Sequence, residues 1–145
     1  MSRRAAGTVS GRPPREGDYV RLARFRHALR RFLHFSEAQA RTARISPNQY
    51  QLMLFIRGFP GPPPSIAELA DRLQIQHQSA VGLVDRSARA GLVRRHADAD
   101  DRRRVRVALT ERGERILARL VAAHARQFDR LSRALSGGRP PSKSR

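Results

Sequence analysis

Apolar residues recur with a helical period near both ends of the chain. The first set predicts a helix over about 18–41, with Asp18 as its N-cap. Its members are Leu22, Phe25, Leu29 and Phe32. A second set with similar spacing predicts a last helix over about 111–135, which Thr110 would cap. Its members are Leu117, Val121, His124, Phe128, Leu131 and Leu135.

Three shorter helices are predicted between these two. Ser46 and Gln49 form one capping box, and Ser65 and Glu68 form another, so a helix is expected to begin at each serine. A further helix ends at Gly91, which suits the position just after a helix C-terminus. The three predicted ranges are about 46–57, 65–73 and 77–90.

Two short stretches near residue 100 alternate between apolar and polar residues. Residues 92–96 and 105–109 are separated by a polar turn, which predicts a β-hairpin. The expected fold class is mainly α with a small β-hairpin wing, that is, a winged helix-turn-helix over about 46–110, within a domain over about 18–135. The segments 1–17 and 136–145 are rich in Gly, Pro and Arg, and we expect a disordered basic arm and a matching tail.

The two apolar sets at the ends of the chain have the heptad-like spacing of paired helices. They predict that the first and last helices mediate a homodimer, and an intramolecular pairing of the two helices is the alternative. The residues expected at the dimer contact are Leu22, Phe25, Leu29, Phe32, Leu117, Val121, His124, Phe128 and Leu131.

The charge of the chain narrows the class of partner. The 145 residues carry a formal net charge of +18, which predicts attraction to DNA, RNA or an anionic membrane surface. The absence of cysteine excludes disulfides and thiolate chemistry. No apolar run is long enough to span a bilayer, and we expect a cytoplasmic protein. Because no catalytic constellation is present, we expect a protein that is not an enzyme and needs neither cofactor nor metal.

The start of the helix at 77–90 has the chemistry of a recognition helix for double-stranded DNA. Its short polar side chains would face base edges in the major groove, and Gly82 would permit a close approach. These polar residues are Gln76, His77, Gln78 and Ser79. The alternative is an ordinary polar surface turn.

The hairpin tip carries Arg102, Arg103 and Arg104, and arginine is favoured in a narrow minor groove. Asp101 would orient a neighbouring arginine through a charge-assisted hydrogen bond. A solvated charged turn is the alternative interpretation of this segment.

Three stretches together resemble the MarR family of bacterial transcriptional regulators. They are SIAELADRL at 65–73, SAVGLVDRSARAGLVRR at 79–95 and DRRRVRVALTERG at 101–113. The last is similar to the wing pattern of the family through Asp101, Arg103, Leu109 and Thr110. Ser87 departs from the family by replacing a bulky apolar residue, and Gln76 by replacing a short capping residue.

The resemblance implies a repressor that binds a palindromic operator as a dimer and is released by a small aromatic ligand. It implies that Arg103 enters the minor groove with Asp101 as its partner, and that Arg86 reaches a phosphate. The expected ligand pocket lies between the dimer helices and the winged domain, although an ordinary core is the alternative. Its candidate residues are His34, Phe35, Tyr50 and Met53. A non-specific basic protein of the nucleoid, or one that binds RNA, is the alternative function.

Overall fold

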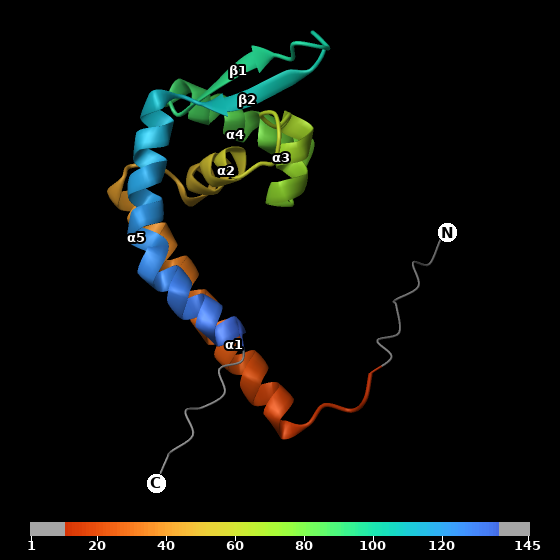
Figure 1. Cartoon of the computed structure of the whole chain (residues 1–145), viewed down its shortest axis with the longest axis vertical. Coiled ribbons are helices and arrows are strands. Elements are labelled where there is room, and N and C mark those ends of the chain that lie inside the picture. The colour runs from red at the N-terminus through yellow and green to blue at the C-terminus, as the bar shows by residue number, and fades with distance from the viewer. Residues whose placement is uncertain (1–10, 137–145) are drawn as a thin grey trace.

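The computed structural model describes residues 11–136, which form five helices and one two-stranded antiparallel sheet (Figure 1). The elements in chain order are α1 Glu16–Thr42, α2 Pro47–Arg57, α3 Ile66–Leu73, α4 His77–Arg89, β1 Val93–Ala97, β2 Val105–Leu109 and α5 Glu111–Leu135. This arrangement confirms the predicted fold class. Of the predicted basic arm and tail, residues 1–10 and 137–145 lie outside the described residues.

Figure 1 shows the molecule as a long arm with a smaller domain at one end. The arm consists of α1 and α5, which pack against each other and run antiparallel. The domain at its upper end consists of α2, α3, α4 and the hairpin, with the hairpin tip projecting away from the arm.

Short-range hydrogen bonds explain where the helices begin. Ser46 and Gln49 exchange backbone-to-side-chain bonds of 2.9 and 3.1 Å at the start of α2. Ser65 and Glu68 do the same at α3. Thr110 Oγ1 accepts the Gly113 N–H at 3.0 Å and caps α5. These three predicted caps are confirmed, because each depends only on residues within one turn.

The predicted starts of the first helix and of the first strand are wrong by two residues and by one residue, respectively. The first helix begins at Glu16, and Asp18 is its third residue rather than its N-cap, with a carboxylate that accepts the Arg15 N–H at 2.9 Å. The first strand begins at Val93 rather than at Leu92. The backbone of Leu92 is used instead to join elements, since its N–H donates to the Ser87 carbonyl and its carbonyl accepts from Thr110.

The joint between the hairpin and α5 requires a glycine. A Cβ on Gly113 would lie 2.1 Å from the carbonyl oxygen of Leu92, far inside the closest approach of real atoms. Thr110 reinforces the same joint, because its hydroxyl donates to the Gly91 carbonyl at 2.6 Å. The first turn of α5 is therefore seated directly on the start of the wing.

One core connects the small domain to the near end of the arm. Its buried side chains come from the five helices, both strands and the turn that precedes β1. They include Leu52, Met53, Leu69, Val84, Leu92 and Val107. Within the described residues, no helix has the length and apolar character needed to cross a bilayer.

Candidate nucleic-acid interface

Helices α3 and α4 are joined by a tight link that leaves the start of α4 open to solvent. Gln74 adopts the left-handed backbone conformation (φ 56°) and ends α3, and its side-chain amide donates to the Asp71 carbonyl at 2.7 Å. The first turn of α4 then emerges with its polar residues exposed. These residues are Gln76, His77, Gln78 and Ser79, the set predicted to face DNA bases.

The opposite face of α4 is buried against the domain core. Ala80, Leu83 and Val84 are buried, and Ser87 extends this buried stripe. Its hydroxyl has no hydrogen-bond partner among the described residues. Since one face of α4 is fixed by apolar packing, the polar face is held outward.

Arg86 lies over Gly82 on the outward side of α4. A Cβ on Gly82 would stand 3.3 Å from Nη1 of Arg86, so the glycine leaves room for this guanidinium group to lie close to the helix backbone. The Arg86 side chain is exposed. A cation is thus available about two to three turns after the polar residues that begin the helix.

The wing tip is a turn in which the aspartates bond to the backbone. Asp101 accepts the Arg103 N–H at 3.0 Å, and Asp98 accepts the Asp100 N–H at 2.8 Å. Asp101 therefore orients the backbone of Arg103, where the sequence predicted a bond to a guanidinium group. The side chains of Arg102, Arg103 and Arg104 are exposed.

Electrostatics reinforce the wing turn. Backbone N–H donation, first from Asp100, together with the Arg106 guanidinium holds the pKa of Asp98 below its ordinary value. The Ser65 N–H lowers the pKa of Glu68 in the same way. Both carboxylates are thus stabilised in the charged form.

An ion pair attaches β1 to α4. Arg95 on β1 donates to the Asp85 carboxylate. Sequence reasoning missed this pair, because residues ten apart in different elements meet only once the hairpin has folded back on α4. Neither residue had been predicted to take part in the site.

The residues predicted at a dimer contact fall into two groups. Leu117 and His124 are buried inside the chain, so their prediction as dimer residues is wrong. The His124 ring stacks on Tyr50 at 5.0 Å between centroids, with Phe32 and Phe35 set edge-on around it. Its Nδ1 bonds to the Leu120 carbonyl. The helical spacing correctly predicted that position 124 is buried, but it did not predict that Tyr50 of the same chain covers it.

The other predicted dimer residues are exposed or half-buried along the arm. Leu22 is 62% exposed, Phe128 58% and Val121 44%. Phe25, Leu29, Phe32 and Leu131 are half-buried. Tyr19, 60% exposed, adds a large apolar side chain near the far end of α1. The arm therefore keeps a set of large apolar side chains in contact with solvent.

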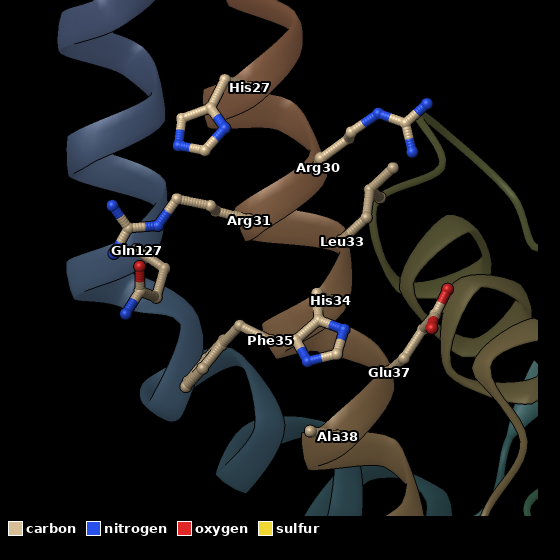
Figure 2. Close-up of a pocket in the computed structure, with 9 residues that line it drawn as sticks. All are labelled: His27, Arg30, Arg31, Leu33, His34, Phe35, Glu37, Ala38 and Gln127. Atoms are coloured by element: carbon tan, nitrogen blue, oxygen red, sulfur yellow. The ribbon is translucent and has the colours of Figure 1, made fainter.

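The four residues predicted to line one ligand pocket do not all line the same hollow. His34 and Phe35 line an open hollow of about 760 Å³ on the arm, whereas Tyr50 and Met53 are buried in the core. Figure 2 shows Phe35 and Arg31 directed toward α5 and Arg30 directed away from it. The hollow is thus flanked by cations as well as by an aromatic ring. Among the described residues, no three His, Asp or Glu side chains are grouped to hold a metal ion.

A comparison with models of known protein families matches the part of the chain that holds α2, α3, α4 and the wing tip. Residues 45–104 match the model of the MarR family. No curated protein sequence matches the chain.

Solved structures match over most of the length of the chain. AbsC, a MarR family transcriptional regulator from Streptomyces coelicolor, has a TM-score of 0.68 at 19% identity, over 90% of this chain and 86% of that one. A mutant of S. aureus MepR bound to an oligodeoxyribonucleotide has a TM-score of 0.62 at 19% identity, over 88% and 87%. Wild-type MarR from E. coli has a TM-score of 0.64 at 18% identity, over 87% and 89%. These likenesses establish the winged helix fold.

Proposed function

We propose that the chain is a DNA-binding transcriptional regulator of the MarR family, since residues 45–104 match the model of that family, and that it is a homodimeric repressor that binds a palindromic operator in double-stranded DNA. The observation that carries the proposal is the wing tip. Its aspartates are bonded to the backbone, while Arg102, Arg103 and Arg104 are exposed beyond the rest of the domain.

The contacts with DNA are proposed from the exposed side chains of α4 and the wing. We assign the major groove to the first turn of α4 and to the open face at Gly82. Arg86 is assigned to a phosphate, and Arg103 to the adjacent minor groove, where the negative potential favours arginine. Arg102 and Arg104 supply further positive charge at the wing tip. The side chains assigned to the major groove are Gln76, His77, Gln78 and Ser79.

The dimer is proposed from the exposed apolar side chains of the arm. Leu22, Val121 and Phe128 are too exposed to contribute fully to the core of one chain, and burial of such side chains against a second copy is favourable. A two-fold axis would repeat the recognition helix about 34 Å away, one turn of DNA, which is why the operator is proposed to be palindromic.

Release by a small aromatic effector is the finer part of the proposal. The hollow beside Phe35 on α1 combines an aromatic ring with Arg31, a combination that suits an aromatic acid. Titration with salicylate as the probe, with DNA release as the measured quantity, tests this part separately.

Since the DNA of a bacterium lies in its cytoplasm, we propose that the protein is located there, and on the nucleoid when it is bound to DNA.

A competition assay at physiological salt tests the main proposal. The DNA that flanks the gene is labelled and competed with itself or with random duplex of equal length. We expect the flanking DNA to compete at a concentration at least about a thousandfold lower than random duplex. Equal competition would contradict an operator and would favour the alternative, a non-specific basic nucleic-acid-binding protein, which the net charge of +18 alone would allow.

A further inference from the structure

Arg106 lies on the second strand of the wing, but its surroundings differ from those of the arginines at the tip. Antiparallel pairing places it opposite His96, and an isolated bridge sets it beside Ser65, the N-cap of α3. Only 14% of its side chain is exposed, whereas the three arginines at the tip are exposed. Arg106 is therefore poorly placed to reach a phosphate.

Three groups from separate parts of the chain surround the Arg106 guanidinium. Nε donates to Asp98 Oδ2 at 2.6 Å, and Nη1 donates to the Pro63 carbonyl at 2.9 Å. Nη1 also lies 3.7 Å from Glu68 Oε2. Since the Asp98 side chain is only 10% exposed, this ion pair is largely shielded from water. Shielded, charge-assisted hydrogen bonds of this kind are among the stronger polar contacts in proteins.

The contacts continue on both sides of Arg106. On one side, Glu68 accepts the Ser65 N–H at 2.7 Å and completes the cap of α3. On the other side, Asp98 accepts the Asp100 N–H at 2.8 Å and shapes the turn that carries the exposed arginines. A connected set of polar contacts, here named the Arg106 network, thus runs from the start of α3 to the wing tip. Its residues are Pro63, Ser65, Glu68, Asp98 and Arg106.

The hairpin needs such support, because its two strands have five residues each and a two-stranded hairpin is only marginally stable by itself. Next to Arg106, the Val107 N–H donates to the Pro64 carbonyl at 2.9 Å. This bond holds β2 against the segment before α3. The Arg106 side chain adds a second attachment, to Asp98, which is the first residue of the turn after β1.

We propose that Arg106 is a positioning residue for DNA binding, and that its network fixes the wing relative to α3. The exposed wing arginines and the first turn of α4 then meet their two grooves in one fixed geometry. The inference rests on the proposed function only in that the wing contacts DNA. It assigns no phosphate to Arg106 itself.

The variant Asp98→Asn distinguishes a role of Arg106 in positioning the wing from a direct effect of charge on DNA affinity. The asparagine oxygen can still accept from the Asp100 backbone, but it offers Arg106 no carboxylate. Removal of a negative charge near DNA strengthens binding if electrostatics alone acts, whereas a loss of positioning weakens it. We expect Asp98→Asn and Arg106→Gln each to weaken binding to a duplex of about 30 base pairs by roughly tenfold. The double variant should bind no more weakly than Arg106→Gln, because both changes break one interaction.

Arg94→Gln is the matched control, since Arg94 is an exposed arginine of the same hairpin and its loss removes the same charge. Thermal unfolding shows that each variant folds. In the free protein, hydrogen exchange at the Val107 amide should accelerate in Asp98→Asn and Arg106→Gln, but not in Arg94→Gln. The dependence of affinity on salt should keep its wild-type slope in Arg106→Gln.

Two results would overturn the inference. One is that Asp98→Asn binds DNA as tightly as the wild type or more tightly. The other is that Arg106→Gln lowers the salt slope by about one, as the loss of a phosphate contact does, while exchange at Val107 is unchanged. The assay uses both the DNA that flanks the gene and random duplex. If the wild type does not distinguish the two, the operator proposal fails, and the comparison of variants still tests the role of Arg106.

Discussion

Gly113 stands where the backbone of α5 touches the turn before the wing. Gly113→Ala would place a methyl group 2.1 Å from the Leu92 carbonyl, and neither backbone can move without disturbing the Thr110 cap. We expect a loss of about 3 kcal/mol in the free energy of unfolding, or more, measured by urea titration.

Gly17→Ala is the matched control for this change. Gly17 also lies in the first turn of a helix, but a Cβ there meets nothing within 4 Å. Since alanine favours a helix over glycine, this variant should be neutral or more stable by up to about 1 kcal/mol. Similar losses in the two variants would contradict the close approach at Leu92.

Arg103 and Gln78 are expected to contribute to DNA binding in different ways. Arg103→Ala should weaken binding to every duplex and reduce the slope of log affinity against log salt by about one. Gln78→Ala should change the order of preference among operator variants and leave the slope unaltered, because an amide reads base edges. Fluorescence anisotropy over a salt series measures both quantities. The same response of both variants to all duplexes would contradict these roles.

The sequence predicted which polar side chains lie near the site, but it did not predict every hydrogen-bond partner or packing neighbour of these side chains. The sequence placed Asp101 beside arginines, yet its carboxylate accepts the backbone N–H of Arg103, two residues away. The spacing likewise predicted that His124 is buried, but not that the Tyr50 ring from α2 is the group that stacks on it. Partners of this kind depend on packing between elements, which periodicity does not describe.

At the scale of the hairpin, the lowered pKa values of Asp98 and Glu68 predict sensitivity to acid. Each pKa is lower in the folded than in the unfolded chain, so each charged carboxylate favours folding. This contribution is present above the unfolded pKa of about 4 and is lost as the pH falls through the folded value.

We therefore expect the urea midpoint of the wild type to fall more steeply below about pH 4 than that of Asp98→Asn, whose side chain cannot titrate. Unfolding curves recorded from neutral to acid pH make the comparison. Parallel declines in the two proteins would show that Asp98 makes no such contribution. A pair of curves for Glu68→Gln separates the second carboxylate from the first.

Elements were predicted well where their signals are local. The capping boxes at Ser46 and Ser65 and the cap at Thr110 each lie within one turn, and all three mark true helix starts. The bridge between Ser65 and Arg106 joins residues 41 positions apart, and nothing in either segment specifies the other. The network that supports the wing was therefore not predictable from the pattern of strands and helices.

At the scale of the whole molecule, the exposed apolar residues of the arm predict a dimer that one charge can disrupt. Phe128→Glu should yield a monomer in analytical ultracentrifugation, because burial of a carboxylate in an apolar contact is costly. Its affinity for operator DNA should fall at least about tenfold, since the second half-site is no longer held.

Val105→Glu is the matched control for dimerisation, because Val105 is also an exposed apolar residue but lies on the wing. It should remain dimeric. A dimer in both variants would show that the exposed side chains of α5 are not the contact between copies.

The spacing of the apolar residues had left a dimer and an intramolecular pair as alternatives. The arm shows the intramolecular pair, since His124 is covered within the chain, and the exposed side chain of Phe128 remains free to form the proposed dimer contact.

The direct seating of α5 on the wing also has a mechanical consequence. Only Thr110 separates the end of β2 from the start of α5, and the glycine at position 113 leaves no slack in this joint. The 25 residues of α5 form a rod about 37 Å long. In the proposed dimer such a rod would act as a lever, because a tilt imposed at its far end by the second subunit or by an effector would turn the wing with it. The distance between the two wings of a dimer would then report events that occur along the arm.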